Sequence, residues 1–430
     1  MANFSFKDNI AAINKTGLKD LIATEFDEVS FLSTNVVVMN LVFSGKIIGG
    51  IKKGTINTIC APSAEGKSLI GLNALKSAQK SGMDCVVIDS ERAFPFSVAK
   101  ALGIDMSVIP VYKLQNIGDI KEVYAKINKN AKSKERANIF VLFDSWGPLV
   151  FTGLMDKAEK GVDTADMGRT ANFKNELANI INAYGNTTFC INHVYDSLQM
   201  YGEKFCIPGG KRLFFLSDGI GLAMSEATWK NPDTDEYMGK LVTMGVKKGR
   251  SARERCRIQF AIRADGALDP FYGLFDEALE SGVLKKVAPG KYVRDFPIIN
   301  KKTGEDMSDI DIDTHEPKRT WREADMYEGT NEPRFWIPIF QNETFREFVE
   351  KKFTYEAEDM LSAKYDVVDM INGDQELPTE DDLYEEVADV HPENEKKEVT
   401  LEDIGLKPEE PAKEEKKAKK ATKKASKKVR

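Results

Sequence analysis

The sequence predicts an α/β protein with a mainly parallel sheet that helices cover on both faces. Two observations support this fold class. Short apolar runs, typical of strands buried on both faces, alternate with helical segments. One of these runs also leads through a short loop that ends in Gly66, Lys67 and Ser68 directly into a helix. This strand, loop and helix order is typical of doubly covered sheets.

Length and composition exclude several classes of protein. The chain has 430 residues, 42% hydrophobic and 30% charged, enough for two or three domains with a sizeable core. No apolar run approaches the length of a membrane span, and the N-terminus lacks the layout of a signal peptide. The five cysteines and three histidines have no paired or metal-ligand spacing. We therefore expect a cytoplasmic protein, in a reducing compartment, that does not engage a membrane.

The elements can be placed in chain order. Short helices are expected within 4–25, and further helices from Lys67, from near Pro95 and over 172–185. A β-rich stretch is expected over 34–62, buried strands at 84–91, 138–147 and 187–193, and later strands at 219–228, 238–249 and 253–263. Long loops are expected at 148–170 and 194–212. The short connections between the later strands predict an antiparallel extension of the sheet.

Changes in composition divide the chain into four parts. We expect an N-terminal segment over 1–35, a core over 36–270, a small mixed α/β domain over 271–365 and a disordered tail over 366–430. The tail has 15 acidic and 3 basic residues over 374–411, then 10 basic and 2 acidic residues over 412–430. Neither of these stretches has an apolar period, which predicts disorder.

The loop before the Lys67 helix nearly matches the phosphate-binding pattern G-x-x-x-x-G-K-[ST]. Gly66 lets the backbone approach phosphates, Lys67 reaches the β- and γ-phosphates, and the Ser68 hydroxyl binds Mg²⁺. ATP and Mg²⁺ are the expected cofactors. The expected nucleotide-binding residues are Ala61, Pro62, Ser63, Ala64, Glu65, Gly66, Lys67, Ser68 and Leu69.

Ala61 departs from this pattern because it replaces the first glycine. Alanine fits if its φ is negative, whereas a left-handed turn would carry a modest penalty. The alternative interpretation of the whole motif is a chance Gly-Lys-Ser before a helix.

Three polar residues follow buried strands. Asp144 ends one strand and is expected to hold Mg²⁺, while Glu91, just beyond another, is positioned to activate a water molecule. His193 ends a third strand and could touch the γ-phosphate. The alternatives are solvated loop carboxylates and a buried structural histidine.

The 194–212 loop has the composition of a DNA-binding loop. It combines aromatic side chains for base stacking, cations for phosphates and glycines for close backbone approach. These residues are Tyr201, Lys204, Phe205, Gly209, Gly210, Lys211 and Arg212. An ordinary flexible loop is the alternative. The cations Lys247, Lys248, Arg250, Arg253 and Arg255 flank a later strand, where they could equally form a plain surface face.

Several segments, in order, resemble the RecA/UvsX recombinases, most closely the UvsX type of tailed bacteriophages. The resemblance covers residues 5–355 and is carried by "FSGKIIGGIKKG", "VVIDSERAF", "FVLFDSWG", "INHVYDS", "GGKRLFFLSDG", "VKKGRS" and "DGALDPFYGLFDEALESG". It implies a RecA-like P-loop ATPase core, a helical N-terminal oligomerisation segment and a small C-terminal domain.

The resemblance also implies an activity: a DNA-dependent ATPase that forms ADP or AMP and phosphate. Such a protein assembles as a helical homo-oligomeric filament on single-stranded DNA and carries out homologous pairing and strand exchange with double-stranded DNA, in phage recombination, repair and recombination-dependent replication. A single-strand-binding protein and a recombination mediator are implied partners.

Individual residues receive roles from the resemblance. Glu91 is the catalytic carboxylate, Asp144 the Walker-B residue and His193 the γ-phosphate sensor. Lys248 and Arg250 match basic residues that reach the ATP of a neighbouring subunit. The loops 148–170 and 194–212 match the two DNA-binding loops. The basic end of the tail departs from the family, whose tails are acidic.

Three alternatives use the same core. They are a hexameric helicase or motor, a DNA-coating scaffold that binds ATP without hydrolysing it, and a small-molecule kinase. Glu91 argues against the scaffold, and the two long loops fit a kinase poorly.

Overall fold

The computed structural model describes residues 29–151, 167–196, 205–231, 234–294, 296, 318, 320–327 and 331–355. All of them belong to one compact unit, Met1–Ala357. The predicted N-terminal helices (4–25), most of the first long loop (152–166) and the predicted disordered tail (366–430) lie outside the described residues.

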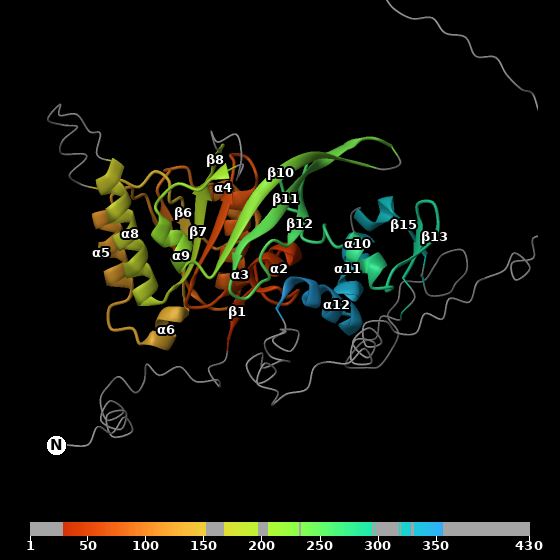
Figure 1. Ribbon diagram of the computed structural model, residues 1–430, viewed down its shortest axis with the longest axis horizontal. Coiled ribbons are helices and arrows are strands. Elements are labelled where there is room, and N and C mark those ends of the chain that lie inside the picture. The colour runs from red at the N-terminus through yellow and green to blue at the C-terminus, as the bar shows by residue number, and fades with distance from the viewer. Residues whose placement is uncertain are drawn as a thin grey trace, which may run out of the picture. The chain divides into compact units, whose positions relative to one another are not determined.

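A large mixed sheet forms the centre of the described chain (Figure 1). Its strands, in order across the sheet, are β12 (Arg257–Arg263), β11 (Tyr237–Gly249), β10 (Gly219–Lys230), β3 (Ile56–Ala61), β7 (Thr187–His193), β6 (Ile139–Asp144), β4 (Asp84–Asp89) and β5 (Val111–Tyr112). From β10 to β5 all neighbours pair in parallel, whereas β10, β11 and β12 pair antiparallel. The predicted fold class and the antiparallel extension are both confirmed.

Helices cover both faces of this sheet because its central strands are apolar on both sides. In β6, Phe140 and Leu142 pack with one core cluster, while Val141 and Phe143 pack with the other. The first cluster includes residues of α2 (Val37–Ser44), α3 (Lys67–Lys80) and α4 (Phe96–Ala101). The second includes residues of α5 (Ile117–Ile127), α8 (Met167–Tyr184) and α9 (Lys211–Leu216). Shorter elements are β1 (Phe31–Leu32), β2 (Ile51–Lys52), α6 (Ser133–Ala137), β8 (Tyr195–Asp196) and β9 (Phe205–Cys206).

The β-rich interpretation of residues 34–62 was wrong for its first part, which forms α2. Nearly all of this helix is buried, and apolar residues lie on several of its sides, so its sequence lacks the period that distinguishes a helix from a strand. Asn40 donates a hydrogen bond to Ile47 O and accepts one from Thr34 N, which ties the helix to its flanks. Gly45 ends the helix in the left-handed conformation.

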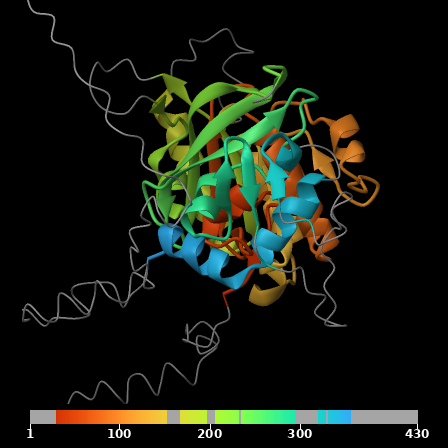
Figure 2. The same cartoon turned by 90° about the vertical axis from the view of Figure 1, so that its right-hand side faces the viewer.

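A smaller set of elements follows the core (Figure 2). It comprises α10 (Phe275–Glu280), the antiparallel strands β13 (Lys285–Ala288), β14 (Lys291–Val293) and β15 (Thr320–Arg322), the 3₁₀ helix η2 (Ala324–Tyr327), α11 (Asn331–Gln341) and α12 (Glu343–Phe353). These elements pack against the core, for example where Glu350 of α12 accepts a hydrogen bond from Ile47 N. The four domain boundaries stay predictions.

Within the described residues, no helix is both long enough and apolar enough to cross a membrane.

Gly273 lies where the chain leaves the core for α10. Its φ is +117°, and a Cβ at this position would lie 2.0 Å from Gln259 O and 2.8 Å from a methyl carbon of Val38. Both the dihedral angle and the close approach therefore require glycine.

We expect Gly273→Ala to lower the melting temperature by roughly 5 °C or more, because backbone strain of about 1–3 kcal/mol adds to a clash with a backbone oxygen. Differential scanning calorimetry measures this. The matched control is Gly282→Ala, whose φ is +77° but whose Cβ meets nothing within 4 Å. Equal losses in the two variants would show that the contact with Gln259 does not matter.

Candidate functional site

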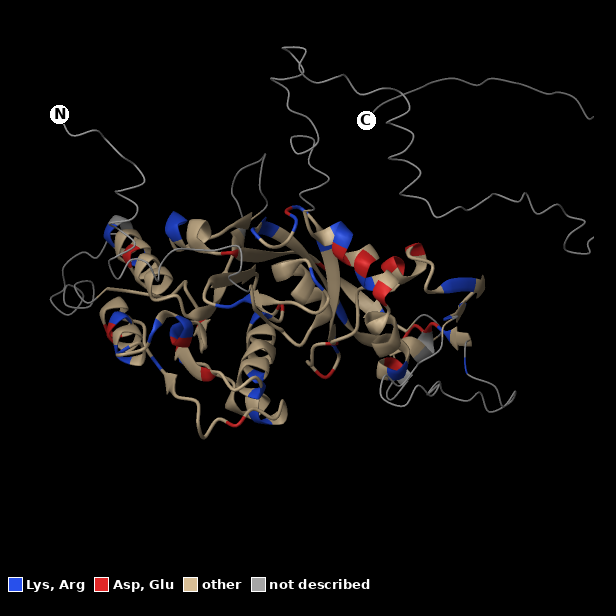
Figure 3. Cartoon of the chain, turned by 90° about the horizontal axis from the view of Figure 1, so that it is seen from below, with Lys and Arg blue, Asp and Glu red and all other residues tan. Residues whose placement is uncertain are grey.

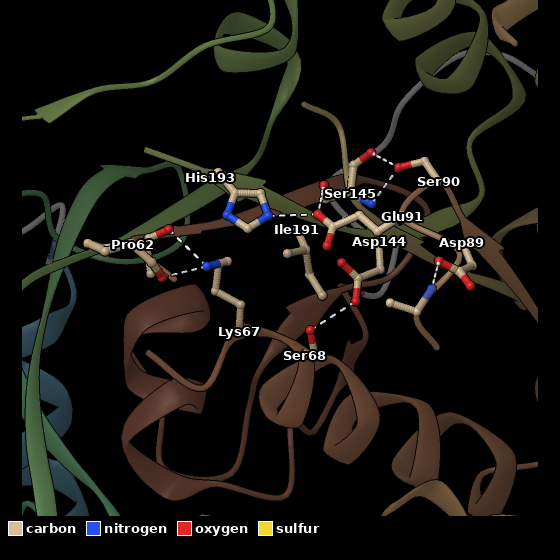
Figure 4. Close-up of polar contacts among 12 residues, drawn as sticks. Pro62, Lys67, Ser68, Asp89, Ser90, Glu91, Asp144, Ser145, Ile191 and His193 are labelled. Carbon is tan, nitrogen blue, oxygen red and sulfur yellow. Dashed lines mark hydrogen bonds and ion pairs between the residues drawn. The ribbon is translucent and has the colours of Figure 1, made fainter. Parts of the chain in front are cut away.

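Parallel pairing brings the predicted site residues to one edge of the sheet. Ala61 pairs with His193, Asp144 pairs with Ile191, and Asp89 pairs with Asp144. The carboxyl ends of β3, β7, β6 and β4 are therefore level, and the side chains that follow them converge (Figure 4).

In the loop between β3 and α3, the residues with left-handed backbone conformation lie after Ala61. Ala61 is the last residue of β3 and is fully buried, so the missing glycine has no left-handed turn to serve. The left-handed residues are Ala64, with φ 64°, and Gly66, with φ 74°. A Cβ on Gly66 would also lie 2.9 Å from Ile262 Cδ1. The second glycine of the pattern is thus the one that the geometry requires.

Lys67 and Ser68 open α3 beneath these strand ends. The Lys67 ammonium is buried and donates hydrogen bonds to the carbonyl oxygens of Ala61, at 2.9 Å, and Pro62, at 2.6 Å. Burial lowers the pKa of Lys67, while the carboxylates of Asp144 and Glu91 act in the opposite direction. Ser68 Oγ donates to Asp144 Oδ2 at 2.9 Å.

Asp144 is half-buried at the end of β6. Burial raises its pKa to about 6, and the negative charge of Glu91 adds to this rise, although the hydrogen bond from Ser68 opposes it. A cation bound beside Ser68 and Asp144 would lower the pKa of Asp144, because it favours the ionised carboxylate.

Glu91 belongs to a small hydrogen-bonded group. Its Oε1 accepts a hydrogen bond from Ser145 Oγ at 2.6 Å and lies 2.7 Å from His193 Nε2. Burial raises the pKa of Glu91, but the hydrogen bonds from Ser145 and His193 outweigh it and hold the pKa below its ordinary value. Ser145 is itself held by Ser90, which accepts from Ser145 N at 2.9 Å and donates to Ser145 O at 2.6 Å.

These residues line a cavity of about 490 Å³. Its walls are Ser63, Ala64, Gly66, Lys67, Ser68, Leu69, Glu91, Asp144, His193, Ile262 and Gly266. The cavity lies at a helix N-terminus, where backbone amides favour an anion. The donor set also fits Mg²⁺, because one hydroxyl and one carboxylate stand side by side and this ion takes most of its other ligands from phosphates and water. Among the described residues, no group of three or more His, Cys, Asp or Glu side chains forms a metal cage of its own.

The sequence patterns missed three contributors to this site. Ser145 fixes Glu91, and Ile262 and Gly266 close the cavity from β12, far along the chain. None of the three belongs to the phosphate-loop pattern, and Ile262 and Gly266 approach that loop only in the folded sheet. Glu65 was expected to contact nucleotide, but it is buried beside Lys240 of β11, 3.6 Å away, and does not line the cavity. Burial and a hydrogen bond with Glu226 raise the pKa of Glu65 to about 7.

The predicted DNA-binding residues are partly described. Tyr201 and Lys204 lie outside the described residues. Phe205, half-buried, begins β9, and Gly209 and Gly210 have φ values of 103° and 93° just before α9. The side chains of Lys211 and Arg212 are exposed at the start of α9. In the view of Figure 3, basic and acidic residues are mixed over the described helices, so this view shows no face of a single charge.

Two contacts attach this segment to the site strands. Trp146 Nε1, just beyond β6, donates to Gly209 O at 2.8 Å, and a Cβ on Gly209 would lie 2.3 Å from Trp146 Cδ1. Asn192 Nδ2, next to His193 in β7, donates to Pro208 O at 2.8 Å. The 205–212 segment is therefore supported by the same strand ends as the cavity.

Lys248 and Arg250 lie at the other end of the sheet. Gly249 of β11 pairs with Gly219, which pairs with Asn57 near the start of β3. Four residues of β3, roughly 13 Å of strand, separate that level from Ala61. The Lys248 ammonium donates to the carbonyl oxygens of Phe214, Phe215 and Ser217 at the end of α9, and burial lowers its pKa.

Comparison with known proteins identifies the families that this chain resembles. The model described as "RecA N-terminal domain" matches residues 7–266, and the model described as "Bacteriophage T4, Recombination and repair protein, C-terminal domain" matches residues 271–349. The "Recombination and repair protein" of Enterobacteria phage T4 is 26% identical over 334 residues, which cover 76% of this chain and 80% of that protein. "Protein RecA" of Chlorobaculum tepidum is 25% identical over 244 residues, covering 56% and 68%. A solved RadB recombinase structure has 17% identity and a TM-score of 0.38, covering 55% of this chain and 98% of that one.

The Trp146–Gly209 hydrogen bond should determine how firmly the 205–212 segment is held. Trp146→Phe keeps an aromatic ring but removes the N–H donor, so we expect trypsin to cleave faster after Lys211 and Arg212. Mass spectrometry of limited digests measures this.

Trp336→Phe is the matched control, because it removes a comparable bond, from Nε1 to Met326 O, in α11. Equal acceleration at Lys211 in both variants would mean that the effect is general loosening rather than release of the segment.

Proposed function

Since the chain belongs to the family defined by the RecA N-terminal domain, we propose that it is a recombinase that binds and hydrolyses ATP, assembles on single-stranded DNA and pairs it with homologous duplex. The observation that carries the proposal is the convergence of Lys67, Ser68, Glu91 and Asp144 at one sheet edge. The family models and relatives named above give no support to the hexameric helicase or motor alternative.

In the proposed ATP site, α3 and the loop before it hold the phosphates. The Lys67 ammonium can exchange its bonds to the backbone carbonyls of Ala61 and Pro62 for bonds to phosphate oxygens. Gly66 admits the phosphates close to the backbone. Mg²⁺, when bound by Ser68 and Asp144, neutralises phosphate charge.

The proposed role of Glu91 is to orient and deprotonate the attacking water. Its depressed pKa keeps the carboxylate ionised, so it can accept a proton at neutral pH. The proposed role of His193, which is bonded to the same oxygen, is to sense the γ-phosphate. A change in the His193 contact would therefore alter Glu91 as well.

The proposed DNA contacts are those of the 194–212 loop. Of its described residues, Phe205 offers a ring for base stacking, and Lys211 and Arg212 offer cations to phosphates. Gly209 and Gly210 allow close approach of the backbone. Tyr201 and Lys204 are proposed on their chemistry alone.

Lys248 and Arg250 are proposed to act on the ATP of a neighbouring subunit. They lie at the opposite end of the sheet from their own phosphate loop, so a contact in the same subunit would require a large rearrangement. A head-to-tail filament joins two different surfaces, which would present these cations to the next subunit. In that position they could stabilise charge in the transition state.

The proposed base predicts a shift in pH dependence. Ser145→Ala removes a hydrogen bond that lowers the pKa of Glu91, so the pKa should rise and Glu91 should protonate at higher pH. The acidic limb of kcat/KM for DNA-dependent ATP hydrolysis should therefore move to higher pH. Ser107→Ala, in an exposed loop, is the control. An acidic limb that stays in place in Ser145→Ala would remove Glu91 from the role of base.

Mixing two inactive variants tests the function and the contact between subunits together. Lys67→Ala lacks the phosphate-binding ammonium and Arg250→Ala lacks the cation supplied to a neighbour, so each alone should be nearly inactive. In an equal mixture, about a quarter of interfaces would pair an intact Lys67 with an intact Arg250 if subunits assort at random. DNA-dependent phosphate release should return to about that fraction.

Arg253→Ala, which removes an exposed cation three residues away, should stay active by itself. If the mixture remains inactive while both variants co-assemble on DNA, Arg250 does not act across the interface.

A further inference from the structure

One wall of the nucleotide cavity comes from the end of β12. Ile262 and Gly266 line this wall. The chain turns back after Ile262, and Leu268 forms an antiparallel backbone bridge with Ile262. Arg263 N donates to Ala267 O at 2.8 Å, and Gly266 N donates to Arg263 O at 2.8 Å, which closes this turn. Ile262 comes within 2.9 Å of the position that a Cβ on Gly66 would take. The turn is therefore packed directly on the phosphate loop.

The side chain of Arg263 points from this turn to buried acceptors. Its Nη2 donates to Asp269 Oδ2 at 2.8 Å, to Tyr327 O at 3.4 Å and, through a short hydrogen bond, to Glu332 Oε2. Asp269 directly follows the turn, whereas Tyr327 ends η2 and Glu332 lies in the first turn of α11. One guanidinium thus joins the cavity wall to the C-terminal elements.

Each partner in this cluster is firmly placed. Asp269 is fully buried, and its Oδ1 accepts hydrogen bonds from Phe271 N at 2.9 Å and Tyr272 N at 3.1 Å. Glu332 is 6% exposed. The Arg263 guanidinium also lies 5.9 Å from the centre of the Trp229 ring. Arg263 therefore joins buried partners that lie on both sides of the turn.

This cluster places two buried carboxyl groups, those of Asp269 and Glu332, beside one guanidinium. Burial and the neighbouring Asp269 raise the pKa of Glu332, although Arg263 opposes the rise. Glu332 Oε1 is buried and has no hydrogen-bond partner in the described chain. Buried carboxylates are tolerated only while a cation with suitable geometry serves them. Arg263 serves both carboxylates through one nitrogen, Nη2, at the far end of its long side chain.

We infer that Arg263 is a positioning residue that couples the C-terminal helix α11 to the nucleotide cavity, so that the C-terminal elements set the affinity for ATP. The inference rests on the proposed ATP site. Its physical basis is that the Arg263–Glu332 contact holds the 263–267 turn, and with it Ile262 and Gly266, against the phosphate loop. Loosening the contact would widen the cavity without touching Lys67, Ser68 or Glu91.

The test is ATP binding and steady-state hydrolysis by full-length variants. Arg263→Lys keeps the charge, but its nitrogen lies one bond nearer the backbone than Nη2 and would not reach both carboxylates. This substitution should raise the Kd and KM for ATP about tenfold, within the range typical of coupling between sites. kcat at saturating ATP should change less than about twofold, because no group that contacts the reacting atoms is altered. Arg346→Lys is the control: it makes the same substitution in α12, where Arg346 lies 3.8 Å from the exposed Glu343, and should bind ATP normally.

A second pair of variants tests the Arg263–Glu332 contact by changing Glu332 of α11 instead. Glu332→Gln keeps an oxygen that accepts from Arg263 and should retain most of the affinity, whereas Glu332→Leu should match Arg263→Lys. If Arg263→Lys does not fold, the ATP affinities of Glu332→Gln and Glu332→Leu test the coupling instead. Normal ATP affinity in both Arg263→Lys and Glu332→Leu, with affinity lost in Lys67→Ala, would overturn the coupling and leave the ATP site standing. Normal ATP affinity in Lys67→Ala would overturn both.

Discussion

The parallel register of β3, β7, β6 and β4 is the constraint on which the candidate site depends. Because these strands end level with one another, residues that follow them meet although they are far apart in the chain. Ser68 reaches Asp144, and Glu91 reaches both Ser145 and His193. A shift of one residue in any pairing would turn each side chain to the other face. The register of these strands therefore decides which side chains meet at the candidate site.

The same strand ends support two different surfaces. His193 contacts Glu91 beside the cavity, while Asn192, which precedes it in β7, holds Pro208 of the proposed DNA-binding segment. Trp146, two residues beyond Asp144, holds Gly209. Since successive strand residues point to opposite faces, one strand end serves both surfaces. The candidate nucleotide cavity and the proposed DNA-binding segment therefore share a structural support.

The sequence predicted those features that leave a local pattern. Buried strands such as 187–193 were predicted because continuous apolar runs bounded by loops are distinctive, and Lys67 and Ser68 because the phosphate loop has its own spacing. Helix α2 was missed because a helix buried on every side has no amphipathic period. Ser145, Ile262 and Arg263 could not be predicted from such patterns, since their importance comes from contacts across the sheet. Lys248 and Arg250 were assigned by resemblance alone, and the register adds the physical reason why their own phosphate loop is out of reach.

In the proposed function, ATP bound at this sheet edge drives assembly on single-stranded DNA. Negative-stain electron microscopy of the full chain with single-stranded DNA and a slowly hydrolysed ATP analogue tests it most directly. We expect helical filaments that require both the DNA and the nucleotide, and we expect none from Lys67→Ala. Closed rings, or filaments of the same kind from Lys67→Ala, would contradict it.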